Sequence, residues 1–176
     1  MVDVRVFADE ETPSDLVTPL RRFLVETFRH FSDEDWEHTH GGWRVVALDG
    51  ADPVAHAAVV PRVMEVAEHP FRTGYVEGVA TERARQGDGL GSRVMTEATA
   101  IVWRRFELGA LSTNRWAFYQ RLGWERWQGP TFVRTAGELV RTPDEDDGVM
   151  VLRFGPSLAI DLAAPISCDA RPGDDW

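Results

Sequence analysis

The segment that most constrains the fold is a strand that runs into a glycine-rich loop and then into an amphipathic helix. Residues 74–81 are predicted to form a strand. Gly87, Gly89 and Gly91 follow, and apolar residues then recur at the spacing of one helix face, namely Leu90, Val94, Ala98, Ile101 and Val102. This change of periodicity predicts a mixed α/β fold.

Other parts of the chain add strands to this unit. Alternating apolar and polar residues predict a strand over 2–7. Two strand-like runs, 43–48 and 54–60, flank turn-forming residues at 49–53, so an antiparallel hairpin is expected there. The remaining expected strands are 108–112 and 149–154.

Helix signals lie mainly in the first forty residues. Thr12-Pro13 and Thr18-Pro19 each place an N-cap residue before a proline, which favours a helix start. One helical stripe follows, made of Leu20, Phe23, Leu24 and Phe28.

Two shorter helices are expected further along. Ser32 with Asp35 three residues later predicts a capping box that opens a brief helix. Residues 115–121 predict another short helix, whereas the last 20 residues have no regular pattern.

Composition limits the class of protein and its partners. At 176 residues without internal repeats, we expect a single domain over 1–176, and the content of 43% hydrophobic and 27% charged residues is that of a folded soluble protein. No apolar run approaches the roughly 20 residues of a membrane helix, and no secretory signal is visible, so a cytoplasmic location is expected. The net charge of -10 disfavours nucleic acid and anionic membranes as partners and favours small cations.

The single cysteine, Cys168, leaves no partner for an internal disulfide. No second thiol or histidine pair stands near it at zinc-ligand spacing, so we expect no metal site. Cys168 is interpreted as structural.

The glycine loop has a specific chemical use. A loop with Gly87 and Gly89 before a helix presents backbone N–H groups and the positive helix end to one point, where a diphosphate fits. An ordinary tight turn is the alternative for an isolated Gly-x-Gly. The P-loop and dinucleotide signatures are disfavoured, because the first needs Gly-Lys-Ser/Thr and the second needs a third glycine three residues on.

The pattern Gln86-x-x-Gly89-x-Gly91 resembles the coenzyme A loop of the GCN5-related N-acetyltransferases (GNAT), which carry Gln or Arg, then x-x-Gly-x-Gly or Ala. Glu77 before the loop and Tyr119-x-x-x-Gly123-Trp124 after it extend the likeness. The resemblance implies a central, mostly antiparallel sheet flanked by about four helices. It also implies acetyl-CoA as cosubstrate, bound by Val79, Gln86, Gly87, Asp88, Gly89, Leu90, Gly91 and Tyr119.

Within that superfamily the chain resembles the aminoglycoside 2'-N-acetyltransferases, from about residue 31 to the C-terminus. The matching segments are 35–39 with Gly41-Gly42, 55–59, 74–80, 108–112, 141–144, 168–169 and 174–176. This resemblance implies acetylation of the 2'-amine of an antibiotic, hence resistance, by a homodimeric enzyme.

The resemblance implies direct attack of a free amine on the thioester, with no protein nucleophile. Glu77 is then the candidate base, or it only pairs with the substrate ammonium. The backbone N–H of Val79 is the expected oxyanion donor if the strand is irregular at Gly78, and Tyr119 is the expected proton donor to sulfur.

A polycationic acceptor needs carboxylates and flat apolar faces. The resemblance implies that the C-terminal tail, 155–176, contributes to this site. The expected acceptor residues are Asp35, Glu77, Gly78, Ser112, Asp174 and Trp176. The acidic loop 144–147 is either a solvated turn or part of the rim, and His56 is interpreted as a satisfied core histidine.

One departure concerns His30, which stands where we expect the family to carry an acidic residue. Kasugamycin, a less cationic relative with a 2'-amine, is therefore an alternative acceptor. Further alternative acceptors are another small amine, such as a polyamine, and a peptide N-terminus. From a different class, a coenzyme A-binding protein without catalysis stays open, although Glu77 and Tyr119 argue against it.

Overall fold

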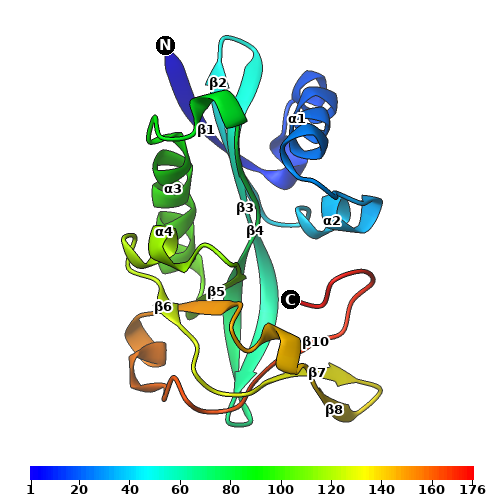
Figure 1. Ribbon diagram of the computed structural model, residues 1–176, viewed down its shortest axis with the longest axis vertical. Coiled ribbons are helices and arrows are strands. Elements are labelled where there is room, and N and C mark those ends of the chain that lie inside the picture. Colours follow the sequence, from blue (N-terminus) through cyan, green and yellow to red (C-terminus); the bar gives the residue numbers. More distant parts are fainter. The chain divides into compact units, whose positions relative to one another are not determined.

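The computed structural model describes residues 1–176, which form two compact units. The first comprises residues 1–60 and 76–101, and the second comprises residues 61–75 and 102–176. Strands β3 (Asp52–Val66) and β4 (His69–Thr81) are long enough to contribute one end to each unit (Figure 1). Strands combined with four α-helices confirm the predicted mixed α/β class.

The first unit contains the predicted hairpin. Strand β2 (Trp43–Asp49) pairs antiparallel with β3, and Gly50 in the turn has a φ of +64°. Strand β1 (Val2–Ala8) pairs antiparallel with β2 along its whole length and ends in a 3-10 turn, η1 (Asp9–Glu11). The strand expected over 2–7 is thus confirmed.

Helix α1 (Ser14–Thr27) corrects two expectations. Its N-cap residue is Pro13 rather than Thr12, so the helix begins one position later than predicted, and Pro19 lies inside it and starts no second helix. Proline removes one backbone hydrogen bond from a helix. Burial along the helix face offsets that loss, because α1 packs into an apolar cluster of Leu16, Leu20, Phe23, Leu24, Trp36, Val46, Leu48 and Ala80.

Helix α2 (Asp33–His38) has the predicted capping box. The Ser32 hydroxyl accepts the Asp35 N–H at 3.1 Å, and the Asp35 carboxylate accepts the Ser32 N–H at 2.7 Å. Trp36 then inserts into the cluster against α1. Helix α3 (Leu90–Arg105) follows the 3-10 turn η2 (Arg83–Arg85) and carries the predicted apolar stripe.

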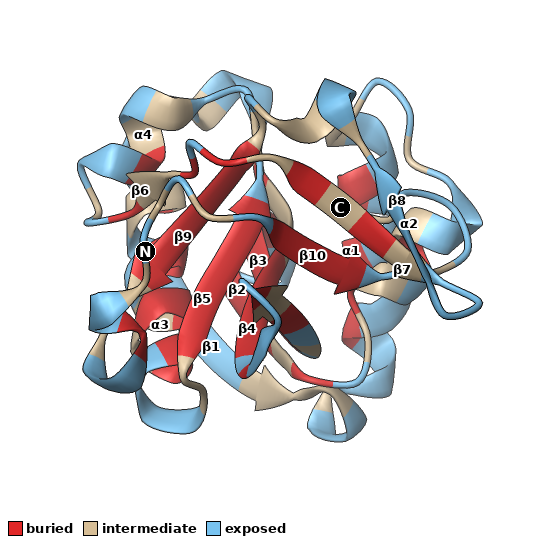
Figure 2. Cartoon of the chain, turned by 90° about the horizontal axis from the view of Figure 1, so that it is seen from below, coloured by how far each residue is buried: buried red, intermediate tan, exposed pale blue.

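The second unit is built around two buried strands, β5 (Leu108–Ser112) and β9 (Val149–Arg153), which pair antiparallel (Figure 2). Strand β5 also pairs parallel with β4, and β6 (Glu125–Arg126) pairs antiparallel with β9. Strands β7 (Thr131–Thr135) and β8 (Glu138–Arg141) form a hairpin. Most pairings are therefore antiparallel, as expected. Helix α4 (Trp116–Gln120) and the 3-10 turn η3 (Pro143–Glu145) complete this part of the unit.

Strands β3 and β4 are longer than the sequence indicated. Ala67 and Glu68 join them with φ values of +48° and +68°, as a tight hairpin turn requires. Such turns usually carry Asn or Gly, so this pair gave no turn signal in the sequence.

The last 20 residues are also more regular than expected. They begin at the end of the 3-10 turn η4 (Gly155–Ala159) and include strand β10 (Ile166–Asp169). Strand β10 pairs parallel with β7 and antiparallel with β3. Ile166 and Cys168 are fully buried, so tertiary pairing rather than local periodicity forms this strand. None of the helices is long and apolar enough to cross a membrane.

Replacing Leu24 by Ala is expected to lower the free energy of unfolding by about 2–5 kcal/mol, because Leu24 is fully buried in the α1 cluster. Urea denaturation measures the change. Val25 is the matched control, since it is 49% exposed on the same helix, and its replacement by Ala should change stability by less than about 0.5 kcal/mol. Equal losses for both variants would contradict the assigned face of α1.

Candidate functional site

The loop between β4 and α3 leaves its backbone exposed. Gly87 and Gly89 have φ values of +98° and +80°, which residues with side chains rarely adopt. A Cβ at either position would meet no atom within 4 Å, so conformation rather than space requires glycine in the free protein. Arg85 secures the loop, with its guanidinium 2.7 Å from the Asp49 carboxylate and 3.7 Å from that of Asp88.

This loop leads directly into the N-terminus of α3. The Arg93 N–H donates to the Gly89 carbonyl at 3.0 Å, and Leu90 is buried beneath the first turn. The first N–H groups of a helix lack acceptors within it and carry its positive partial charge. The exposed residues 86–89 therefore fit a diphosphate, as the resemblance implies for coenzyme A.

In the first unit, β4 is irregular at the expected position. Gly78 has a φ of +58° in the middle of the strand, and a Cβ there would lie 3.0 Å from the Thr39 methyl and 3.3 Å from His56 Nδ1. The conformation requires glycine, and a side chain would also press against these two neighbours. Its neighbours Glu77 and Val79 are half-buried.

The segment after α2 supports this part of β4. Thr39 is buried against Gly78, and its hydroxyl accepts a hydrogen bond from the Arg44 guanidinium at 3.0 Å. Arg44 is itself buried, lies 2.7 Å from the Asp9 carboxylate and stacks over Trp36 at 4.8 Å. These contacts hold the C-terminal end of α2 beside β4. Asp35, expected to bind the acceptor, caps the other end of this helix.

Tyr119 of the second unit lies on α4 and is 6% exposed. Burial raises the pKa of its phenol to about 12, although the charge of Arg115 and a hydrogen bond with Thr113 lower it. Its ring makes edge contacts with Phe118 and Trp124, and Gly123, with a φ of +89°, turns the chain after α4. Tyr119 therefore stays protonated, and hence a donor, at any working pH.

A group of polar and acidic side chains in the second unit includes two of the expected acceptor residues, Ser112 and Asp174. Ser112 ends β5, and its hydroxyl donates to the Glu145 carboxylate at 3.3 Å. Burial raises the pKa of Glu145, and the charges of Asp174 and Asp144 raise it further. The acidic loop thus belongs with Ser112 and Asp174. The sequence offered only the run of acids at 144–147 as a signal for Glu145.

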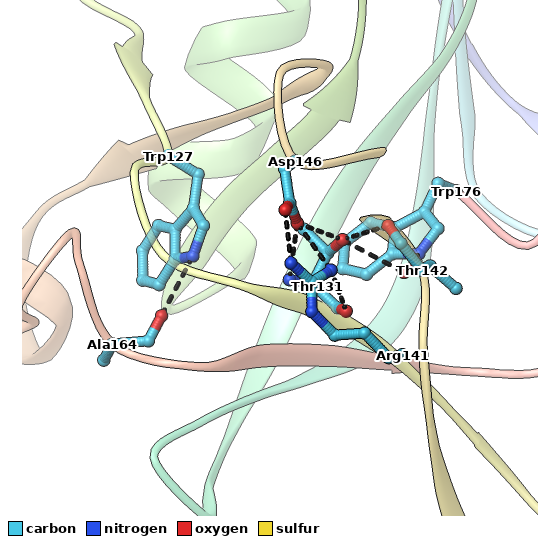
Figure 3. A network of polar contacts seen from close by, with 7 residues as sticks. All are labelled: Trp127, Thr131, Arg141, Thr142, Asp146, Ala164 and Trp176. Carbon is cyan, nitrogen blue, oxygen red and sulfur yellow. Dashed lines mark hydrogen bonds and ion pairs between the residues drawn. The ribbon is translucent and has the colours of Figure 1, made fainter. Parts of the chain in front are cut away.

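The terminal Trp176 is anchored rather than frayed. Its side chain is buried, and the indole N–H donates to the Thr142 hydroxyl at 3.2 Å. Thr142 belongs to a network with Thr131, Arg141 and Asp146 (Figure 3). The Arg141 guanidinium lowers the pKa of Asp146 to about 2, so this network stays charged in neutral solution.

The tail before Trp176 folds back on itself. Arg171 donates to the main-chain oxygens of Asp174 at 2.6 Å and Trp176 at 3.4 Å, and the Asp174 carboxylate accepts the Trp176 N–H at 3.1 Å. Cys168 is buried beneath it, 3.3 Å from the Asp175 carbonyl oxygen, and burial raises the pKa of its thiol to about 11. A buried, protonated thiol agrees with a structural role.

The expected site residues divide between the units. The first unit holds Asp35, Glu77, Gly78, Val79, Gln86, Gly87, Asp88, Gly89, Leu90 and Gly91, and the second holds Ser112, Tyr119, Asp174 and Trp176. No cluster of three or more His, Cys, Asp or Glu side chains is arranged to hold a metal ion.

Residues 3–127 match the family described as an acetyltransferase (GNAT) domain. The aminoglycoside 2'-N-acetyltransferase of Mycolicibacterium fortuitum is 40% identical over 161 residues, which cover 89% of this chain and 83% of that protein.

Two solved structures share the fold. A GNAT family N-acetyltransferase from Escherichia coli in complex with CoA has a TM-score of 0.67 at 16% identity, covering 95% of this chain and 89% of that chain. A GNAT family acetyltransferase from Brucella melitensis in complex with acetyl-CoA has a TM-score of 0.64 at 15% identity, covering 94% of each chain.

Replacing Gly89 by Ala is expected to weaken coenzyme A binding about tenfold, because a left-handed backbone costs a residue with a Cβ about 1–2 kcal/mol. Titration calorimetry measures the affinity. Gly91 is the matched control within the same motif, since the resembled pattern carries Gly or Ala there. It lies within α3 and has no positive φ, so its replacement by Ala should leave affinity within about twofold. If Gly91→Ala weakened binding more than Gly89→Ala, the loop conformation would not contribute to coenzyme A binding.

Proposed function

Because this chain belongs to the GNAT family of acetyltransferases, we propose that its acetyl-CoA-dependent reaction acetylates the 2'-amino group of an aminoglycoside antibiotic. The carrying observation is the acidic group formed by Glu145 and Asp174 beside Ser112 in the second unit. Acetylation removes a positive charge from the antibiotic, and we propose resistance as the result.

The acidic group has the charge that a polycation requires. The raised pKa of Glu145 follows first from burial and then from the nearby charges of Asp174 and Asp144. Carboxylates that repel one another are stabilised when an ammonium group lies between them. The net charge of -10 draws cations toward the protein in the same way.

Three further residues are assigned to acceptor binding. Asp35 and Gly78 in the first unit, and Trp176 in the second, are proposed to bind the acceptor. The hydrogen bonds that anchor Trp176 support its part, because they keep Asp174 and the chain end in one place.

For the chemistry, acetyl-CoA supplies an activated acetyl group as its thioester. We assign Glu77 on β4 to accept the proton of the amine, directly or through a water, since only a neutral amine attacks. The Val79 N–H is assigned to the charge that develops on the carbonyl oxygen, and the irregular backbone at Gly78 supports this role. Tyr119 donates its proton to the departing sulfur.

Two alternatives to this function are the same reaction with another acceptor, and coenzyme A binding without catalysis. Kasugamycin is the second candidate acceptor, because the exposed His30 supplies no carboxylate where the family is expected to carry one. A coenzyme A-binding protein without catalysis is disfavoured by Tyr119, which is buried and held protonated as a donor must be. The homodimer and the cytoplasmic location stay predictions.

The proposed acceptor is tested by thiol release from acetyl-CoA with pairs of aminoglycosides that carry either a 2'-amine or a 2'-hydroxyl. We expect turnover only with the 2'-amine, with kasugamycin assayed in parallel. Equal turnover with both members of a pair would exclude the 2' position, and turnover with kasugamycin alone would favour the second candidate.

Replacing Tyr119 by Phe is expected to lower kcat about 100-fold, because the hydroxyl is the proposed acid and the ring packing is kept. Steady-state kinetics at saturating substrates measure the loss. With a pKa of about 12, Tyr119 should cause no fall in wild-type kcat below about pH 10. Replacing Phe118 by Leu is the control for packing on α4. Unchanged turnover of the Phe variant at position 119 would remove the phenol from the mechanism.

A further inference from the structure

His56 is a polar residue buried in the core of the first unit. It lies on β3 opposite Val46 of β2, is fully buried, and places its ring Nδ1 2.7 Å from the Gly78 carbonyl oxygen of β4. The sequence suggested a satisfied core histidine. The structure agrees for Nδ1 only, because Nε2 is buried without a hydrogen-bond partner.

The partner atom decides which ring nitrogen carries hydrogen. A carbonyl oxygen only accepts, so Nδ1 must be the N–H donor and Nε2 the bare nitrogen. Burial lowers the pKa of the imidazole to about 3, the charges of Arg44 and His40 lower it further, and the bond to Gly78 raises it only in part. The ring is therefore neutral at working pH. An apolar side chain would fill the same space and leave no buried nitrogen without a partner. The hydrogen bond to Gly78 is therefore what histidine provides here and an apolar residue does not.

The bond acts on one particular peptide group. The Gly78 carbonyl and the Val79 N–H belong to the same planar trans peptide, so they point in opposite directions. Capture of the oxygen by His56 fixes the direction of the N–H. This matters at Gly78, because a glycine with a φ of +58° has no side chain that would restrict rotation of the peptide.

The same bond also strengthens the donor. A hydrogen bond accepted by an amide oxygen polarises the amide and makes its N–H a better donor. Packing also restricts Gly78, because the Thr39 methyl would lie 3.0 Å from a Cβ built there.

We propose that His56 is a positioning residue for acetyl transfer, which orients the Gly78–Val79 peptide so that the Val79 N–H faces the acetyl carbonyl oxygen. It touches neither substrate and acts only through this peptide. The inference rests on the oxyanion role assigned to Val79 in the proposed function.

Two variants of nearly equal shape test the inference. In His56→Asn the amide nitrogen replaces Nδ1 as donor, whereas His56→Leu fills the site without one. We expect Leu to lower kcat about 10- to 100-fold, part of the loss that removal of an oxyanion donor causes, with KM for acetyl-CoA within about twofold. Asn should recover most of kcat. Equal losses of kcat in variants of equal thermal stability would overturn the proposal.

A second measurement needs no acceptor and uses the wild-type protein. Nitrogen NMR of the His56 ring should show hydrogen on Nδ1 and none on Nε2, and the Val79 amide signal should move in the Leu variant but much less in the Asn variant. Hydrogen on Nε2 would overturn the proposal, even if neither variant folds. If every 2'-amine fails in the turnover assay while these NMR results hold, the proposed acceptor is wrong and the role of His56 stands. The kcat comparison then uses whichever amine is turned over.

Discussion

The left-handed backbone of Gly78 within β4 is the constraint on which the proposed chemistry of the first unit depends. A regular strand uses its N–H groups in sheet pairing and alternates its side chains between two faces. At Gly78 this regularity is interrupted between Glu77 and Val79, the residues assigned to proton transfer and to the oxyanion. The surroundings then hold a conformation that glycine alone would leave free, with His56 on the carbonyl and Thr39 against the α-carbon.

In the second unit, the main constraint is that carboxylates of like charge lie near one another. Glu145 and Asp174 repel each other, and the pKa of Glu145 is raised first by burial and then by this repulsion. Hydrogen bonds from Ser112 and from the anchored tail hold the acids in place before any cation arrives. Such preorganisation favours a cationic ligand, because less order is lost when it binds.

Short-range signals predicted their elements well. The capping box of Ser32 and Asp35, the turn at Gly50 and the positive φ values of the glycine loop all depend on residues a few positions apart. Where the sequence misled, distant contacts decided. Pro19 stays helical because α1 is held by its buried face, and β10 exists because β3 and β7 lie on either side of it.

The sequence by itself determined the glycine loop, the helix that follows it, the excess of acidic residues and the motifs typical of an acetyltransferase. Only the tertiary structure decided which groups meet. His56 and Gly78 are 22 residues apart, Ser112 and Glu145 are 33 apart, and Thr142 and Trp176 are 34 apart. The physical reason is that a local pattern reports the conformation of a few neighbouring residues. Which side chain captures a distant carbonyl or shares a distant charge depends on how whole strands and helices pack.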